Sequence, residues 1–281
     1  MTSITQPQTR AKAKQLSYRT VAVPTLDAAT RAKMLALMER CYEGVVPERF
    51  FRDLDDKQYV ILLHDAAGDA GPKTLAGFST IALKRVPDRG REAEVLYSGD
   101  TVIHPDYWGQ KMLDTAFARF LLWRKLRRPF SPFYWLLLSA GYKTYLIILR
   151  YFAGAFPRRG LTPDPADEAF VHRICGEWFG AQYDAATQVV RMSGHYKVRE
   201  GVAPVDGRAL ADPDIAFFHA RNPGHVNGDE LVCLAEVRLS ELGRAFVRIA
   251  TKRFTRRRKQ RALEPAAAPA AQSEPKTELG T

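Results

Sequence analysis

The stretch that decides the fold runs from Glu94 to Leu113, EVLYSGDTVIHPDYWGQKML, and continues into the apolar-periodic run DTAFARFLLWRKL. It predicts a strand that ends near His104 and Pro105, a turn, and a helix that begins at Gly109. The first amides of a helix have no carbonyl partner within the helix, so a strand that leads into a helix directs several of them at one place. Such a place favours an anionic phosphate group.

The wording of the turn, Ile103-x-Pro105-x-Tyr107-x-Gly109, resembles a known signature. It is similar to the acyl-CoA motif of the GNAT superfamily of N-acetyltransferases, V-x-P-x-Y-R-G-x-G-x-G/A. Trp108 stands where the family has arginine, and Lys111 and Leu113 stand where it has its second and third small residues. The indication of the fold is therefore stronger than that of the ligand. The resemblance implies that the donor is bound by Ile103, Tyr107, Trp108, Gly109, Gln110 and Lys111.

The elements around this stretch follow the order of the same fold. Periodicity and turn residues predict strands over 17–24, 58–64, 75–83, 92–103 and 133–139, and helices after Asp27, near Pro47, over 109–127 and over 142–155. This order indicates an α/β protein with a GNAT-like mixed, mostly antiparallel sheet flanked by helices, and with a C-terminal α-rich extension. The resemblance covers about residues 17–157. It implies that strands 92–103 and 133–139 diverge to admit the pantetheine arm of an acyl donor.

Composition divides the chain into four parts. Residues 1–15 are polar, and we expect them to be disordered. Residues 16–157 correspond to the GNAT-like acyltransferase domain. Residues 158–254 form a C-terminal extension that ends in a basic amphipathic helix, which we expect to begin near Asp229. Residues 255–281 form a basic and then Ala/Pro-rich tail that we also expect to be disordered.

If the resemblance holds, the reaction moves an acyl group from a thioester to an amine. Such a reaction needs a group that accepts the proton of the amine and one that protonates the leaving thiolate. The family's acid is a tyrosine in a Y-x-x-x-G-F phrase, which Tyr151 matches in YFAGAF although the glycine is displaced by one. Tyr142 and Tyr145 are nearby alternatives, and ordinary packing is a third interpretation of all three rings.

The strand 92–103 offers Glu94 and Asp100 as bases. Alternation along a strand places the two carboxylates on the same face. A bulge at Gly99 would exchange the faces beyond it. His104 fits a turn residue equally well, and a solvated face is the alternative for both carboxylates.

The donor that the resemblance implies is acyl-CoA or the phosphopantetheine of an acyl carrier protein, used as a co-substrate with no permanently bound cofactor. The runs FYWLLLS and YLIILRYF would suit a long acyl chain, although a core would look the same. N-acyl amino acid and acyl-homoserine lactone synthases are relatives of this fold that use such chains. The alternative function is a non-catalytic GNAT-fold module that binds a lipid, a membrane surface or a protein.

The formal net charge of +11 is concentrated near the C-terminus. Between Arg238 and Arg261 ten basic residues stand against one acid, Glu241, so the rest of the chain is almost neutral. This segment predicts binding to an acyl carrier protein or an anionic membrane surface. A helix that packs on the core and is followed by a solvated basic tail is the alternative. The residues expected to make that contact are Arg238, Arg244, Arg248, Arg256, Arg257 and Arg258. Nucleic acid is the least favoured partner, because no second basic face with interleaved aromatics appears beyond Arg124 to Arg128.

The remaining signals exclude several classes of protein. Three cysteines, Cys41, Cys175 and Cys233, are too few and too scattered for a disulfide framework. His172 and Cys175 share a predicted helix, but further ligands lie far away in the sequence, so we expect no metal site. Charges and glycines interrupt the apolar stretch 133–156, so we expect no transmembrane helix. Without the apolar core of a signal peptide, a cytoplasmic protein, peripheral to the inner membrane if the tail binds it, is expected.

Overall fold

The computed structural model describes residues 15–65, 74–191, 197–198, 207–244 and 246–247. Contacts within the chain group residues 1–245 into one compact unit and residues 246–281 into a second. Only residues 246 and 247 of the second unit are described. The sheet, the helices that cover it and the candidate site all belong to the first unit.

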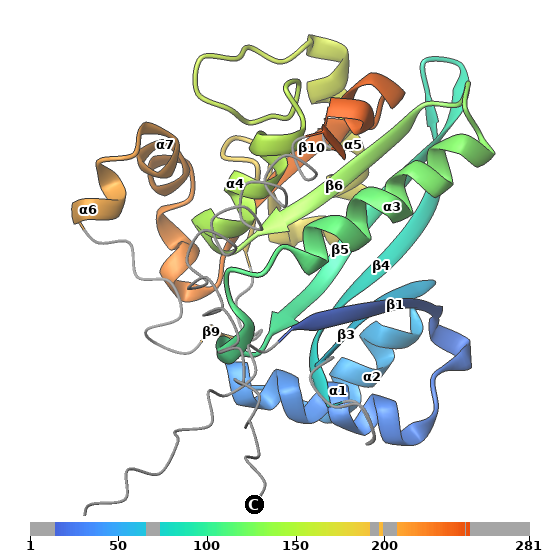
Figure 1. The fold of residues 1–281 in the computed structure, drawn as a ribbon. Helices are drawn as coiled ribbons and strands as arrows, with labels where there is room; N and C mark the ends of the chain where they lie inside the picture. Colours follow the sequence, from blue (N-terminus) through green and yellow to red (C-terminus); the bar gives the residue numbers. More distant parts are fainter. Residues whose placement is uncertain (1–14, 66–73, 192–196, 199–206, 245, 248–281) are drawn as a thin grey trace, which may run out of the picture. The chain divides into compact units, whose positions relative to one another are not determined.

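An eight-stranded sheet forms the centre of this unit, with the strand order β1-β3-β4-β5-β6-β10-β8-β7 (Figure 1). Its strands are β1 Leu16–Ala22, β3 Tyr59–Asp65, β4 Leu75–Asp88, β5 Arg91–Ile103, β6 Phe133–Ser139, β7 Tyr183–Asp184, β8 Val189–Val190 and β10 Glu230–Glu236. Only β5 and β6 run parallel; the other paired strands of the described sheet are antiparallel. A separate pair joins β2 Tyr42–Glu43 to β9 Lys197–Val198. The predicted mixed, mostly antiparallel α/β class is confirmed.

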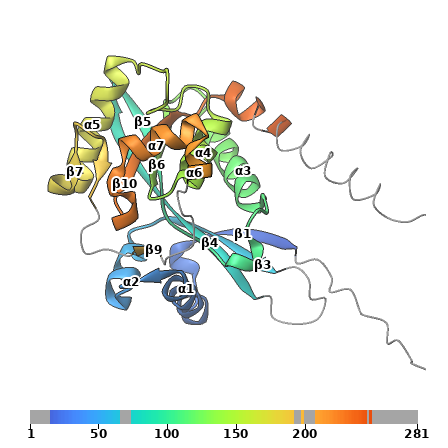
Figure 2. The ribbon, with the colours of Figure 1, turned by 90° about the vertical axis from the view of Figure 1, so that its left-hand side faces the viewer.

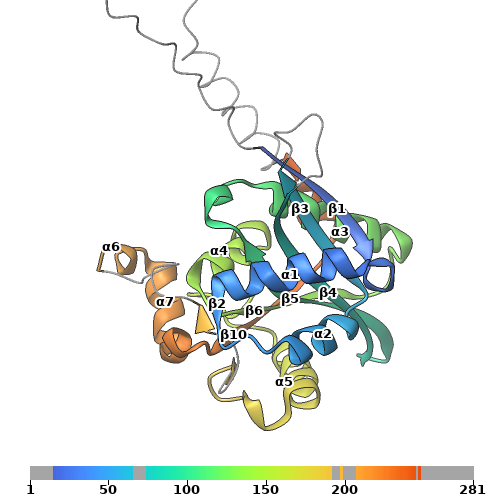
Figure 3. The ribbon, with the colours of Figure 1, turned by 90° about the horizontal axis from the view of Figure 1, so that it is seen from below.

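Helices cover both faces of the sheet. The α-helices are α1 Ala28–Cys41, α2 Pro47–Asp55, α3 Met112–Arg127, α4 Tyr142–Tyr151, α5 Pro165–Phe179, α6 Gly207–Leu210 and α7 Pro213–Arg221. Short 3-10 helices are η1 Val23–Thr25, η2 Pro105–Tyr107, η3 Gly180–Gln182 and η4 Pro223–Asn227. In Figure 3, α1 and α2 lie in front of β3, β4 and β5. In Figure 2, α3 and α5 lie on opposite sides of β5 and β6.

Local sequence explains why the first helix forms where it does. The Asp27 carboxylate accepts a hydrogen bond from the Thr30 amide at 2.7 Å, which satisfies one of the unpaired amides at the start of α1. Met34, Leu37 and Met38 recur at helical spacing and are buried. They join a core cluster with residues of α2, β3, β4 and β5, and that cluster fixes α1 and α2 on one face of the sheet.

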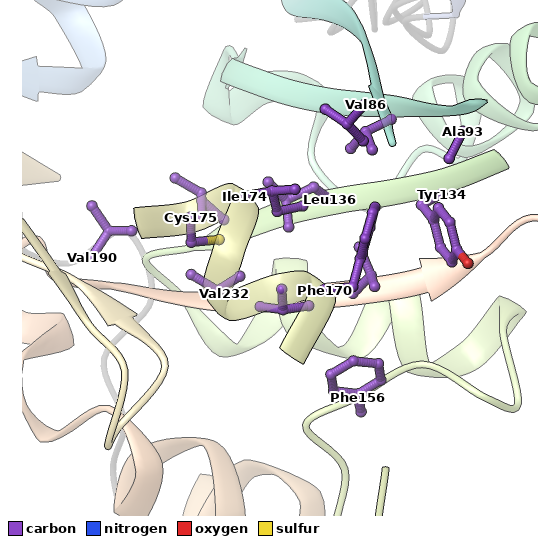
Figure 4. Packing of buried hydrophobic residues seen from close by; sticks show 14 residues of the cluster. Val86, Ala93, Tyr134, Leu136, Phe156, Phe170, Ile174, Cys175, Val190 and Val232 are labelled. Carbon is purple, nitrogen blue, oxygen red and sulfur yellow. The ribbon is translucent and has the colours of Figure 1, made fainter. Parts of the chain in front are cut away.

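The same face continues under α5. Phe170, Ile174 and Cys175 of α5 pack over Leu136 of β6 and Val232 of β10 (Figure 4). The opposite face carries α3 and α4, because the Phe117 ring of α3 stacks on Trp135 of β6 at 5.3 Å between ring centroids. Phe152, which caps the C-terminus of α4, contacts that same tryptophan. The sheet therefore separates an α1/α2/α5 face from an α3/α4 face.

The expectation of one long helix from Asp229 is wrong. Residues 230–236 form β10, which lies between β6 and β8 in the sheet. Leu231 to Ala235 are all buried, and a strand covered on both faces reads as a continuous apolar run that periodicity cannot distinguish from a helix. Helical residues follow only from Leu239.

Two predicted helix boundaries also move. The helix expected from Gly109 begins at Met112, after the short helix η2, and the one expected to reach residue 155 ends at Tyr151. The first difference arises because the backbone of Gly109 adopts a positive φ of 80°, which an α-helix does not contain. Within the described residues, no helix combines the length and the apolar character that crossing a bilayer requires.

Candidate functional site

The parallel strands β5 and β6 separate halfway along β5. Their pairing runs from Glu94 opposite Phe133 to Ser98 opposite Leu137 and then stops. β5 continues to Ile103, whereas β6 ends at Ser139, beside Leu231 of β10. The predicted divergence of these two strands is confirmed.

A bulge lies at the point of divergence. Ser79 of β4 pairs with Thr101, but Ile81 pairs with Ser98, so Gly99 and Asp100 together face Thr80 alone. Of the two alternatives for this strand, the bulge at Gly99 is therefore the correct one, and the expectation that Glu94 and Asp100 share a face is wrong. A Cβ atom at Gly99 would lie 2.6 Å from the Thr80 hydroxyl oxygen and 3.0 Å from Cε of Lys57, so only glycine fits there without a shift of its neighbours.

The bulge places Asp100 on the α1/α2/α5 face, where Asp53 and Lys57 are its charged neighbours. Burial and, to a lesser extent, the Asp53 carboxylate raise the pKa of Asp100 to about 6, while the Lys57 ammonium acts in the opposite direction. Lys57 itself donates to Asp53 at 2.9 Å and is almost fully buried. The Oδ2 atom of Asp100 has no hydrogen-bond partner among the described residues. Oδ2 of Asp100 can thus accept a proton or a hydrogen bond at the point where β5 and β6 separate.

A second carboxylate, Glu230 at the start of β10, accompanies Asp100. Burial and then the charge of Asp100 raise the pKa of Glu230 to about 8. Tyr42 and Tyr97 lie in the field of both carboxylates, and burial is the main cause of the raised pKa of each phenol. Sequence analysis missed Glu230, since residues 229–254 read as a helix that begins outside the sheet.

Glu94 lies elsewhere. Its carboxylate accepts from Arg124 of α3, with Nε and Oε1 2.9 Å apart and with a second contact between Nη2 and Oε2. Glu94 pairs with Phe133 where the parallel ladder begins, and its partner Arg124 places it on the α3/α4 face. The structure therefore separates the two candidate bases: Asp100 is at the divergence, and Glu94 joins α3 to β5.

The turn expected to bind the donor connects the end of β5 to α3. The His104 ring accepts from the Asp106 amide at 3.2 Å, and the Trp108 indole donates to the Ile103 carbonyl at 2.8 Å. Lys111 is the N-cap residue of α3, and its side chain accepts no hydrogen bond from the amides of the first turn. The amides of Met112 to Asp114 form the first turn, where no carbonyl of the helix can accept from them.

Other residues of the turn fix its position. The Tyr107 hydroxyl donates to Asp65 at 2.6 Å, and this bond, more than burial, raises the pKa of Tyr107 to about 12. The Gln110 side chain accepts from the Leu16 amide at 3.1 Å. Trp108 is half exposed, and the Lys143 ammonium of α4 lies 5.1 Å from the centroid of its indole ring. The turn is thus tied to β1 and β3 and adjoins the start of α4.

An acid already occupies the first turn of α3. The Asp114 carboxylate accepts from the Tyr151 hydroxyl at 2.8 Å and lies 3.4 Å from the Lys111 ammonium. Burial, then the charge of Asp114, raises the pKa of Tyr151 to about 12. Sequence analysis named Tyr151 and Lys111 as separate candidates and missed Asp114, the residue that joins them.

A prediction for the turn concerns Gly109. Its φ of 80° is strained for any residue with a Cβ, although no atom lies within 4 Å of where that Cβ would be. We expect Gly109→Ala to lower the free energy of unfolding by about 1 kcal/mol through backbone strain alone. Urea unfolding measures it. Gly176→Ala, inside α5 and equally uncrowded, is the matched control and should instead stabilise the protein by roughly 0.5–1 kcal/mol. Equal effects of the two substitutions would contradict the argument.

No set of three or more His, Cys, Asp or Glu side chains in the described part of the chain is placed to hold a metal ion. His172 of α5 hydrogen-bonds the Tyr183 hydroxyl at 2.9 Å. Cys175 and Cys233 are buried free thiols, and burial raises the pKa of each to about 12.

No protein-family model matches the sequence, and no curated protein matches it. Solved structures with a similar arrangement include a probable N-acyltransferase from Enterococcus faecalis, at 15% identity and a TM-score of 0.36. The match covers 46% of this chain and only 31% of that protein. YhbS, a GNAT family N-acetyltransferase from Escherichia coli in complex with CoA, is 12% identical with a TM-score of 0.34, over 50% of this chain and 71% of YhbS. NAA60 from Arabidopsis thaliana, in complex with acetyl-CoA, is 10% identical with a TM-score of 0.37, over 48% of this chain and 82% of NAA60.

The chain has a GNAT-like fold. That statement rests on its own element order and on the divergence of β5 and β6. Similarity at these identities and TM-scores carries no argument about what the chain binds or does.

Proposed function

We propose that this chain is an N-acyltransferase that moves an acyl group from a thioester donor to an amine. The observation that carries the proposal is the divergence of β5 and β6 at a bulge that holds Asp100, a carboxylate with a pKa of about 6. A base of this pKa is mostly ionised at neutral pH and can still accept a proton from an ammonium group. The turn that follows β5 leads from Ile103 to the N-terminus of α3 at Met112.

In the proposed reaction, the Asp100 carboxylate takes a proton from the acceptor's ammonium group. The neutral amine nitrogen then forms a bond to the carbonyl carbon of the thioester, and the bond from that carbon to sulfur breaks. The nitrogen loses a second proton to water as the neutral amide forms, and Asp100 returns its own proton to solvent. The thiolate leaves with the electron pair and is protonated in its turn. Only the acceptor, the donor and a proton carrier take part, so the step needs no metal ion and no redox partner.

Tyr151 is the proposed partner of the leaving thiolate. With a pKa raised to about 12, its phenol stays protonated when a thiolate forms. A phenol of that pKa is a weaker acid than a thiol, and its phenolate would lie beside Asp114. Tyr151 therefore assists as a hydrogen-bond donor to the sulfur, for which its hydroxyl has to turn away from Asp114, while water supplies the proton.

The donor is acyl-CoA or an acyl carrier protein, and its phosphate groups are assigned to the turn from Gly109 to Lys111. Lys111 and Lys143 supply positive charge there, and the first-turn amides of α3 supply donors. Asp114 opposes an anion at this place, so the Lys111 ammonium has to neutralise it. The same Asp114 supports the second candidate function, a non-catalytic module that binds no CoA.

The charges around Asp100 also limit the acceptor. Glu230, with a pKa of about 8, is mostly protonated at neutral pH. The Asp53 and Asp100 carboxylates repel each other, and the Lys57 ammonium that opposes this repulsion already contacts Asp53. An acceptor that enters as a cation relieves their repulsion, whereas a carboxylate next to the amine, as in a free amino acid, adds to it. We therefore propose a cationic amine without a neighbouring carboxylate as the acceptor.

The basic C-terminal segment is proposed to bind an acyl carrier protein or an anionic membrane surface. Two of its arginines already have carboxylate partners, since Arg238 contacts Glu236 and Arg244 contacts Glu241. Arg248 and the arginines at 256–258 lie outside the described residues. The proposal rests on the sequence alone for these four arginines. Truncation after Ile249 removes Arg256, Arg257 and Arg258 and should weaken the binding.

The direct experiment measures release of free thiol from acetyl-CoA and from a long-chain acyl-CoA, with diamines and amino acids as acceptors. Thiol release that depends on a diamine supports both the reaction and the acceptor class. If no acceptor causes thiol release, and native mass spectrometry of protein purified from its host shows no bound donor, the acyltransferase proposal fails. The non-catalytic module then remains.

A prediction separates the two ends of the donor site. We expect Lys111→Glu to weaken binding of the CoA donor by about tenfold or more, because it turns a neutralising charge into a second anion beside Asp114. Tyr151→Phe should leave donor affinity nearly unchanged and lower turnover, since it acts only as the C–S bond breaks. Isothermal titration and steady-state rates measure these effects. Lys33→Glu, an exposed change on α1, is the control, and unchanged affinity in Lys111→Glu would place the phosphates elsewhere.

A further inference from the structure

An exposed apolar and basic surface lies at the C-terminal end of α3, away from the candidate site. It comprises Arg119, Trp123, Leu126, Arg127 and Phe130, here called the α3 patch. The exposed fraction is 37% for Trp123, 58% for Leu126 and 87% for Phe130. Residues 119, 123 and 126 repeat at the spacing of one helix face, and Phe130 follows in the next turn of chain. Large apolar side chains that gather on one surface indicate a binding site, whereas scattered ones do not.

The loop that presents Phe130 is held by basic side chains. Arg91 of β5 donates to the Phe130 carbonyl, and Lys125 donates to the Ser131 carbonyl at 2.8 Å. Arg128 reaches Glu92 of the β4–β5 hairpin at 3.0 Å. Figure 1 shows this end of α3 beside the tip of that hairpin. The backbone is thus fixed with the Phe130 ring in water, so exposure is built into the fold at this place.

The charged side chains around these apolar ones are mainly basic, and the Glu92 carboxylate beside them is paired with Arg128 and Arg85. In the part of the chain that the structure describes, Arg119 and Arg127 form no ion pair. The Arg127 guanidinium lies 4.4 Å from the centroid of the Trp123 ring. No Asp or Glu occurs between Asp114 and Asp164 in the sequence. The basic residues in that interval are Arg119, Arg124, Lys125, Arg127, Arg128, Lys143, Arg150, Arg158 and Arg159.

We propose that the α3 patch docks this protein onto an anionic lipid bilayer. Trp, Leu and Phe enter the boundary between headgroups and acyl chains, while Arg119 and Arg127 contact anionic headgroups. A tryptophan at this boundary keeps its indole N–H in the polar layer. Other basic side chains of residues 115–163 add to the electrostatic attraction between the protein and the anionic bilayer at longer range.

Charge complementarity decides between this occupant and others. A second copy would bring two positively charged patches together, and the chain's own segment 248–261 is basic and would be repelled as well. A bilayer that contains phosphatidylglycerol offers both the negative charge and the apolar layer that the patch needs. The inference is independent of the proposed function, because none of the five residues of the α3 patch is assigned to the reaction.

The test uses the full chain with vesicles of phosphatidylcholine, with or without an equal amount of phosphatidylglycerol. We expect co-sedimentation with the anionic vesicles, reduced by about tenfold or more in Trp123→Ser/Leu126→Ser/Phe130→Ser. Val226→Ser, which removes an apolar side chain that is 70% exposed on η4, should have no effect. Arg119→Glu/Arg127→Glu should weaken binding by a similar factor. Lys33→Glu/Arg40→Glu makes the same change of charge on exposed residues of α1, on the opposite face, and should not.

A second readout excludes a contribution from the C-terminal segment. Brominated acyl chains quench the fluorescence of a tryptophan that enters the bilayer. The emission of Trp123 is the wild-type spectrum minus that of Trp123→Phe, and vesicles with brominated chains should quench this difference. The proposal is overturned if this difference is not quenched, or if both patch variants bind as the wild type does. It is also overturned if the patch variants convert a dimer to a monomer while the wild type binds no vesicles.

Discussion

Asp100→Asn should lower the rate of amine acylation by about 10²- to 10⁴-fold, the loss that removal of a general base produces. The wild-type rate should rise with pH through about 6, where the pKa of Asp100 lies, and then level off. The variant should lose this rise, because Asn cannot accept the proton. Donor affinity should change little, since the donor turn lies beyond the end of β5. Initial rates across a pH series measure both effects.

Asp56→Asn is the matched control, because it removes an exposed carboxylate outside the site. It should leave the rate and the pH profile as they are. If Asp100→Asn retains the wild-type rate while acylation is measurable, Asp100 is not the base. If neither protein acylates any amine, it is the proposed function itself that fails.

Asp100→Asn should lower the rate but raise the free energy of unfolding at pH 7. The pKa of Asp100 in the folded protein, about 6, lies above its ordinary value of 3.8. Between these values the folded state binds more protons than the unfolded state, so the contribution of Asp100 to stability falls as pH rises and stays low above pH 6. Asp100→Asn removes this fall and should unfold at a higher urea concentration than the wild type at pH 7. The difference should vanish below about pH 4, where both side chains are neutral.

Arg124→Met should produce the largest loss of stability, about 3–5 kcal/mol, because it leaves the Glu94 carboxylate buried without its partner. Glu94 is 5% exposed, and its two oxygens contact the Arg124 guanidinium. The pair also fastens α3 to β5, so its loss acts on the elements that position the donor turn. Urea unfolding followed by circular dichroism measures the change.

Glu94→Leu/Arg124→Met is the informative companion to that variant. Replacing both charges with apolar groups removes the unpaired carboxylate, so most of the lost stability should return. Because Asp100 and not Glu94 is the proposed base, the folded double variant should still acylate amines. A double variant that is as stable as the wild type but inactive would instead favour Glu94 as the base. A loss below about 1 kcal/mol in Arg124→Met would mean that the pair is weak.

Periodicity and turn chemistry were enough to predict the first half of the chain. Asp27 caps a helix with three buried residues on one face, and Pro105 ends a strand ahead of the next helix. These signals act within a few residues, so the sequence contains them in full. The order of elements followed from such local signals, the mixed sheet followed from the resemblance to the GNAT fold, and a bulge at Gly99 was one of two open alternatives.

Pairing between distant strands could not be predicted in the same way. The segment 230–236 has the composition of a buried helix as much as that of a strand, and only its position between β6 and β8 decides. That pairing brings Glu230 to Asp100, across more than a hundred residues of chain, so that burial and the charge of Asp100 raise the pKa of Glu230. Tertiary structure thus determined the charge of the site.

The sequence by itself determined which residue types the site contains, and the tertiary structure decided which of them meet. Glu94 and Asp100 look equivalent on one strand, yet one extra residue in the ladder places them on opposite faces, one bound to Arg124 and one beside Lys57. Lys111 and Tyr151 were visible as separate candidates, and Asp114 joins them only when α4 packs beside α3. The physical reason is that the energy of a charge depends on its neighbours and its burial, which belong to the fold and not to the local sequence.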